Sequence, residues 1–140
     1  MIAPTSFFNT ILGAKLSNPQ WSWGAQREDN TVFLRVWQDQ TKKREDGFLW
    51  VRVSYGQGAK LDSLGNRERL RHIAEIQNGN PGYAVMCLAT KQYDSAEDGP
   101  RNIKSFNRKD VFHIGEIQLG EYDCHYAKLI DRVPVSSVKP

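Results

Sequence analysis

The side chains of residues 31–37 alternate strictly, and this alternation constrains the fold more than any other feature of the chain. Successive side chains of a strand point to opposite faces, so a period of two predicts a β-strand. The two faces would carry Val32, Leu34 and Val36 against Phe33, Arg35 and Trp37. Residues 48–55 alternate in the same way, and we expect the two strands to pair antiparallel across the polar loop 38–47.

Three later segments also have strand character. Residues 83–89 form a nearly continuous apolar run, which is typical of a central strand buried on both faces. Residues 110–119 and 126–135 supply two more strands. Residues 136–140 then form a short tail that we expect to be frayed.

Two segments have the spacing of helices. In residues 5–15, apolar side chains recur at helical intervals after Thr5 or Ser6, either of which can cap the first turn. In residues 67–78 the same spacing follows Asn66, the expected N-cap, and Gly79 closes the helix. His72 would lie on the exposed side of this second helix.

The order of elements is helix, two strands, helix and three strands. It predicts one α+β domain over residues 1–140, built as a small curved β-barrel or sheet. We expect five or more mainly antiparallel strands with two or three flanking helices. A doubly wound parallel sheet would need more helices than this chain offers.

Composition limits the location and the partners. No stretch approaches the roughly 20 apolar residues of a membrane span, and the N-terminal segment lacks a signal peptide, so we expect a cytoplasmic protein without membrane contact. The two cysteines, Cys87 and Cys124, are expected as reduced thiols in the core. The net charge of +3 permits an anionic partner without requiring one.

Sequence motifs for catalysis are absent. Cys124 and His125 are adjacent, so in a strand they would point to opposite faces and could not act together as nucleophile and base. No zinc-binding spacing occurs, and Gly56-Gln57-Gly58 lacks the rest of a phosphate-binding loop. We therefore expect no catalytic residue, no metal and no cofactor, and the residues favour a binding module over an enzyme.

All four tryptophans lie within residues 21–50. Core packing is one interpretation, because tryptophan buries a large apolar area. The alternation favours a pocket for Trp37 and Trp50, which would share their strand faces with Arg35 and Arg52. Tryptophan planes beside polar groups suit a flat ligand, and the edge contacts could come from Asp39 and Gln40.

Basic residues gather in three segments: 42–44, 67–71 and 101–109. Solvated loops and helix faces would account for them. Basic loops near an aromatic pocket would equally suit the backbone of a nucleic acid while one base is examined.

Several strings together resemble the PUA-like group of small barrels, which includes the SRA, EVE and YTH readers. They are residues 21–25 (WSWGA), 32–39 (VFLRVWQD), 82–89 (GYAVMCLA), 103–106 (IKSF) with 111–115 (VFHIG), and 127–134 (AKLIDRVP). More narrowly, the chain is similar to reader domains attached to nucleases in modification-dependent restriction.

This resemblance implies a barrel whose mouth accepts a flipped, modified base between aromatic side chains, with nucleic acid as partner and DNA favoured over RNA. The base-pocket residues it implies are Trp21, Trp23 and Trp37 as walls, with Ser22, Asp39 and Gln40 for edge contacts. The phosphate-binding residues it implies are Lys42, Lys43, Arg101, Lys104 and Arg108. The chain has no nuclease motif, so cleavage would need a separate nuclease domain or subunit.

Three alternatives remain open at this stage. The tryptophan-rich face could dock a partner protein in an interaction or regulatory domain. The domain could bind RNA, which PUA-like readers also recognise. A small-molecule enzyme is the third, and its support would be turnover lost on changing His113 or His125.

Overall fold

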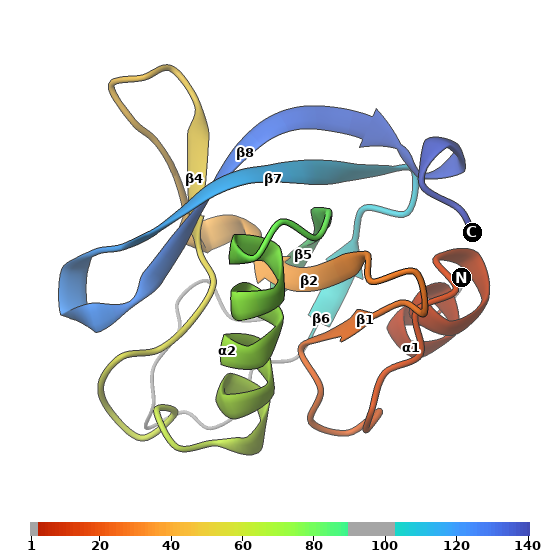
Figure 1. The fold of residues 1–140 in the computed structure, drawn as a ribbon, viewed down its shortest axis with the longest axis horizontal. Helices are drawn as coiled ribbons and strands as arrows, with labels where there is room; N and C mark the ends of the chain where they lie inside the picture. The colour runs from red at the N-terminus through yellow and green to blue at the C-terminus, as the bar shows by residue number, and fades with distance from the viewer. Residues whose placement is uncertain (1–2, 90–102) are drawn as a thin grey trace.

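The computed structural model describes residues 3–89 and 103–140, which form an α+β fold around one open mixed sheet (Figure 1). The eight strands of these residues are β1 (Gly24–Gln26), β2 (Val32–Trp37), β3 (Thr41–Lys43), β4 (Leu49–Arg52), β5 (Gly82–Ala89), β6 (Ile103–Phe106), β7 (Asp110–Leu119) and β8 (His125–Pro134). Their hydrogen-bonded order is β1-β2-β5-β7-β8-β4-β3, and β6 pairs with β5 beside this path.

The pairing confirms a mainly antiparallel sheet of more than five strands. Within the described residues only β2 and β5 are parallel, with Val32 opposite Gly82 and Trp37 opposite Cys87. A parallel pair needs a long crossover, and helix α2 (Leu64–Gln77) supplies it. β5 is central, as its apolar run predicts, because it also pairs with β6 and β7.

The predicted pairing of the strands in 31–37 and 48–55 is wrong. β4 lies between β3 and β8, with Val51 opposite Thr41 on one side and Ala127 on the other. The loop 38–47 contains β3, which turns back onto β4 at Gly47, where φ is +83°. A local period of two identifies a strand but does not identify its partner.

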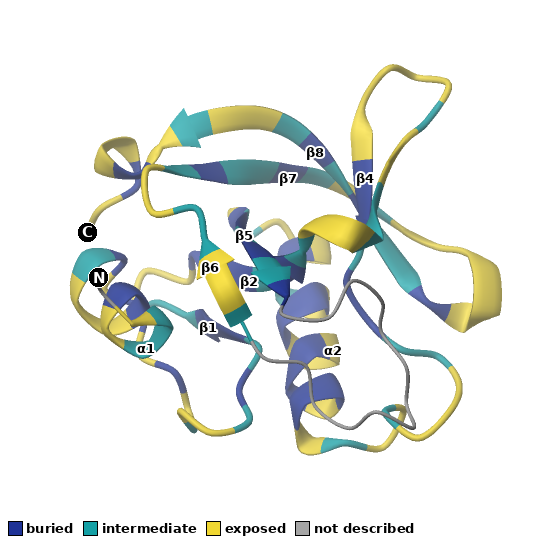
Figure 2. Cartoon of the chain, turned by 180° about the vertical axis from the view of Figure 1, so that it is seen from behind, coloured by how far each residue is buried: buried dark blue, intermediate teal, exposed yellow. Residues whose placement is uncertain are grey.

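Two apolar clusters pack against the sheet (Figure 2). In one, Ile73 and Ile76 of α2 lie against the buried valines and leucine of β2. In the other, Phe7 and Phe8 lie against Phe33 and further side chains of β5 and β7. The free thiols of Cys87 and Cys124 are buried, as predicted, and burial raises the pKa of Cys87 to about 12.

The first helix is shorter than predicted. α1 covers Pro4–Ser6 and continues as a π-helical turn over Phe7–Ile11, which ends before Gly13, where φ is +67°. The N-cap is Ala3, and no side chain caps it. A turn that begins with proline needs no donor at that position, which explains why the predicted caps are not used.

The C-terminal segment packs against this N-terminal helix, as the position of the two ends in Figure 1 indicates. A 3-10 turn over Val135–Ser137 follows β8, and Val138 is buried. Arg27 Nη1 donates hydrogen bonds to the carbonyl oxygens of Leu12, at 3.0 Å, and Val138, at 2.6 Å. Residues 135–138, which overlap the tail predicted at 136–140, thus contact the body of the fold.

α2 begins three residues earlier than predicted. Ser63 is its N-cap, and the Ser63 hydroxyl accepts a hydrogen bond from the Asn66 backbone N–H. Ser and Asn are both good N-caps, so sequence alone did not separate the two positions. Gly79 ends the helix with φ of +108°, as predicted.

His72 was predicted to be exposed, but the structure buries it at 8% exposure. Burial, followed by the charges of Arg69 and Arg71, lowers the pKa of His72 from 6.5 to about 4. The helical period places His72 three residues from Arg69, on the face that meets the sheet. Because Arg69 and His72 are both polar, the sequence alone did not identify this face of the helix as buried.

We expect the free energy of unfolding to fall by about 3 kcal/mol as the pH decreases from about 6.5 to 4. In this window the unfolded chain binds a proton at His72 and the folded chain does not, so acid favours unfolding. Urea denaturation of the wild type and His72→Gln across this range measures the effect. Equal pH slopes for the two proteins would contradict it, and His125→Gln controls for the other buried imidazole.

No helix among residues 3–89 and 103–140 is long and apolar enough to cross a membrane.

Candidate ligand-binding cavity

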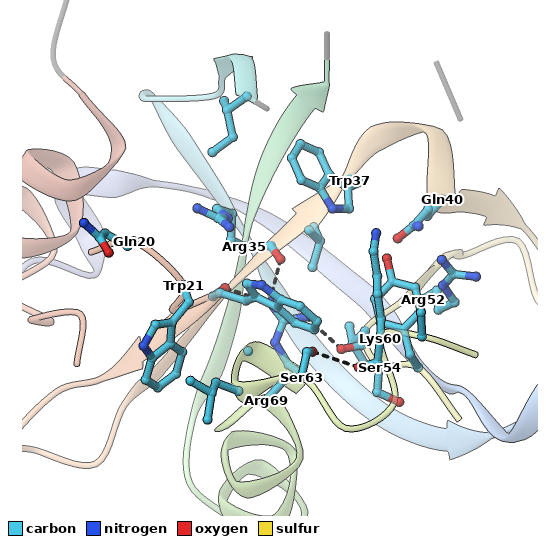
Figure 3. A pocket seen from close by; sticks show the side chains of 18 residues that line it. Gln20, Trp21, Arg35, Trp37, Gln40, Arg52, Ser54, Lys60, Ser63 and Arg69 are labelled. Atoms are coloured by element: carbon cyan, nitrogen blue, oxygen red, sulfur yellow. Dashed lines mark hydrogen bonds between the residues drawn. The ribbon is translucent and has the colours of Figure 1, made fainter. Parts of the chain in front are cut away.

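A cavity of about 630 Å³ opens where four segments of the chain meet (Figure 3). They are residues 20–23 before β1, the end of β2, the end of β4 with the following loop, and the first turns of α2; Ile103 of β6 also lines it. Its size falls within the range of small-molecule and cofactor sites. In Figure 3, Trp21 and Lys60 lie on opposite sides, with Arg35 and Trp37 between them.

Aromatic side chains form much of the wall. Trp23 contacts Tyr55 edge-to-face, with 5.7 Å between the ring centroids and 69° between the planes. Gly65 of α2 lies directly against Trp23, since a Cβ at Gly65 would be 2.2 Å from its indole Cε2. Only glycine allows the helix and the indole to approach this closely. Trp21 and Trp37, both partly exposed, complete the aromatic part of the wall.

Arg69 joins three of the segments. Its Nη1 donates to the carbonyl of Val53 at 2.8 Å, and its Nη2 donates at 2.7 Å to the carbonyls of Trp23 and Arg35. Burial, then the nearby Arg35 charge, lowers the pKa of Arg69 to about 9. The guanidinium therefore stays charged at neutral pH, and its donors hold the ends of β2 and β4 beside residue 23.

Arg35 differs from Arg69 because its side chain makes no hydrogen bond or ion pair with any described residue. Burial lowers the pKa of Arg35, and no carboxylate opposes that effect. A guanidinium carries five N–H donors. Those of Arg35 are thus available to whatever occupies the cavity.

The charged side chains that the structure describes in the cavity wall are all cationic. Among the lining residues that the structure describes, none is Asp or Glu. The cationic members are Arg35, Arg52, Lys60 and Arg69. A cavity lined in this way attracts anionic or acceptor-rich ligands.

Ser54 lies at the back of the cavity, bonded to His125. The Ser54 hydroxyl is 2.8 Å from His125 Nδ1 and also accepts the His125 backbone N–H at 2.9 Å. Burial lowers the pKa of His125, and the tautomer of its imidazole decides whether the Ser54 hydroxyl or Nδ1 donates in this hydrogen bond. Both contacts join the end of β4 to the start of β8, which makes this pair a structural link.

The structure brings four of the six predicted base-pocket residues together: Trp21, Trp23, Trp37 and Gln40 line the cavity. Ser22 does not line it. Its side chain is buried, accepts the Asn18 N–H at 2.9 Å and lies 3.4 Å from Glu68 Oε2. Asp39 is exposed in the 3-10 turn Gln38–Gln40, outside the cavity lining.

Trp50, which alternation assigned to the same face, packs elsewhere. It is buried at 4% exposure, and its indole N–H donates to Asp46 at 3.1 Å. The Arg44 guanidinium stacks on the Trp50 ring at 4.1 Å from the centroid. β4 pairs with β3 rather than β2, so its face is not continuous with that of β2.

The predicted phosphate-binding residues are dispersed. Lys42 and Lys43 are exposed on β3, and Lys104 is exposed on β6 beside the cavity-lining Ile103. Arg108 lines a separate cavity of about 300 Å³. Arg101 lies outside the described residues.

Sequence reasoning missed the roles of Arg35, Arg69 and Tyr55. The composition of the Arg35 face indicated a pocket, but the lack of a counter-ion depends on the tertiary structure. A signal for Arg69 existed, because a helix places Arg69, His72 and Ile73 on one face and Arg67 and Arg71 on another.

No group of three metal-ligating side chains occurs among the described residues.

These features define an α+β fold with a cationic, tryptophan-lined cavity between the ends of β2 and β4 of a mixed sheet. Comparisons of the chain with protein-family models, with curated proteins and with solved structures gave no match.

Proposed function

We propose that this domain binds nucleic acid and holds one base, carrying a modification, in the tryptophan-lined cavity. The observation that supports it is the placement of Trp21, Trp23 and Trp37 around one 630 Å³ space beside Arg35. In this proposal the fold is PUA-like and the domain reads rather than cleaves, so any cleavage requires a separate nuclease domain or subunit. DNA is the favoured partner.

The energetics are consistent with an extruded base. Flipping costs a few kcal/mol, and the bound base must recover that cost through stacking and edge hydrogen bonds. Each base stacked on an aromatic side chain contributes about 1–3 kcal/mol. Gln40 at the rim and the Arg35 donors offer edge contacts. The cavity also has room for a substituent on the base.

The exposed lysines on β3 and β6 would contact phosphates beside the opening. Such contacts position a nucleic acid without reading its sequence. Affinity should therefore fall as salt rises, because each neutralised phosphate releases counterions.

We expect Trp21→Ala and Trp37→Ala to weaken binding of a modified oligonucleotide about tenfold each, since each removes a stacking surface. Trp21 belongs to neither apolar cluster, so its variant should stay folded. Fluorescence anisotropy measures this with duplex and single-stranded oligonucleotides, with and without cytosine and adenine modifications, at two salt concentrations.

Tyr122→Ala is the matched control, because Tyr122 is 70% exposed and lies outside the cavity lining. It should bind as the wild type does. Wild-type affinity in both folded tryptophan variants would show that the cavity is not the site. Weak binding that ignores modification would favour a protein partner for this surface.

A further inference from the structure

The electrostatic state of Arg35 points to the chemistry of the ligand. Its side chain lines the cavity and is partly buried, yet no described carboxylate accepts its donors. Removing a charge from water without giving it a partner is unfavourable. A bound anion would recover part of that cost.

The neighbouring guanidinium does not relieve Arg35. Arg69 lies close enough for the Arg35 charge to oppose its own, and its Nη donors are occupied by three backbone carbonyls. Glu68 offsets the Arg69 charge but is not among the groups that act on Arg35. Among the described residues, the Arg35 charge is therefore not balanced by a carboxylate.

Arg35 is also placed to act on the same ligand as Trp37. The two residues are two positions apart on β2, so they share a face at a spacing of about 6.6 Å. A ring stacked on Trp37 would bring a substituent within reach of the Arg35 guanidinium (Figure 3). The planar fork of a guanidinium matches two oxygens of a carboxylate or phosphate.

We propose that Arg35 binds an anionic oxygen group of the ligand inside the cavity, so that the site selects a planar ring bearing a carboxylate or a phosphate. This inference rests on the proposed nucleic-acid function in one respect only, which is that the planar ring is a nucleobase. Two sources offer this chemistry: a modified base with a carboxylate substituent, and a nucleotide that enters with its own phosphate.

The first measurement uses the wild type alone. Affinities are compared for oligonucleotides with 5-carboxylcytosine or 5-methylcytosine, and for nucleoside 5′-monophosphates against the matching nucleosides. We expect the anionic member of at least one pair to bind about tenfold tighter, as a charge-assisted hydrogen bond would give. The pair that shows the preference identifies the source. Equal affinities within both pairs would overturn the proposal.

The second measurement assigns the preference to Arg35. Arg35→Gln should abolish it, and Arg35→Lys should retain only part of it, because lysine lacks the fork. Arg132→Gln is the charge-matched control, since Arg132 is exposed on β8 and bonded to Asp110. A preference that survives in folded Arg35→Gln would overturn the assignment, as would its loss in Arg132→Gln.

The ligand-free stability of Arg35→Gln gives a further readout. A residue kept for ligand binding should be replaceable at no cost in stability, whereas a structural arginine should not. A marked fall in the free energy of unfolding would contradict the proposal.

The failure of this inference differs from the failure of the proposed function. If neutral modified oligonucleotides bind in a Trp21-dependent way without an anion preference, the base pocket stands and the anion site does not. If mononucleotides bind through Arg35 and no oligonucleotide binds, the anion site stands and the nucleic-acid function does not.

Discussion

Replacing Arg69 with methionine is expected to lower the free energy of unfolding by about 3 kcal/mol or more. The substitution removes the guanidinium donors from the carbonyls of Val53, Trp23 and Arg35, and only the Trp23 carbonyl is known to keep a second donor, the Arg35 backbone N–H at 2.8 Å. Each hydrogen bond lost at a buried acceptor costs about 1 kcal/mol or more. It also removes the Arg69 charge that interacts with the buried Glu68. Relief of the repulsion from Arg35 offsets only part of this loss.

Urea denaturation at neutral pH, followed by tryptophan fluorescence, measures the change. Arg71→Met is the matched control, because Arg71 is exposed on the same helix two residues away. It should change stability by no more than about 0.5 kcal/mol. Arg69→Lys should also be strongly destabilised, since one ammonium cannot reach three carbonyls held by a fork. Equal losses for Arg69→Met and Arg71→Met would refute the role of the carbonyl contacts.

The Arg69 contacts show what local patterns could and could not predict. Alternation located the strands in 31–37 and 48–55 because the two-residue period is a local property of the chain. The partners of a strand depend on segments far away, so β4 was assigned to the wrong neighbour. β3 has three residues, which is too few for a period to be visible.

For the candidate site too, local patterns predicted some features and not others. The resemblance placed Trp21, Ser22 and Trp23 together in one base pocket, whereas the structure puts Trp21 and Trp23 in the cavity lining and buries Ser22 outside it. Alternation along β2 indicated that Arg35 and Trp37 share a face. The environment of each arginine depends on groups that are distant in the sequence and meet only in the folded chain. A local sequence period therefore cannot predict it.

A second substitution, at Asn66, tests how the cavity wall is held in place, because the Asn66 side chain binds the loop that forms one wall. Its side chain is fully buried. Oδ1 accepts the Tyr55 N–H at 2.9 Å, and Nδ2 donates to the carbonyls of Tyr55 at 3.0 Å and Leu61 at 2.9 Å. These bonds fix residues 55–61 to the first turn of α2, with Tyr55 and Lys60 in the cavity wall.

Asn66→Ala should lower the free energy of unfolding by about 2–3 kcal/mol, because the fully buried Asn66 side chain makes three hydrogen bonds to backbone groups, and all three are lost. It should also weaken ligand binding, since part of the binding energy must then order the loop. Asn66→Asp should destabilise at least as much as the alanine variant, because it buries a carboxylate oxygen opposite the carbonyl oxygens of Tyr55 and Leu61. Asn78→Ala is the control, since Asn78 is exposed at the other end of α2.

Denaturation and amide hydrogen exchange over residues 55–63 separate the two effects of Asn66→Ala. Faster exchange confined to this loop, with weaker binding, is the expected result, because local opening precedes global unfolding. Unchanged exchange in the loop would contradict its attachment through Asn66. A loop that opens while affinity is retained would place the binding energy on the Trp21, Trp37 and Arg35 side of the cavity.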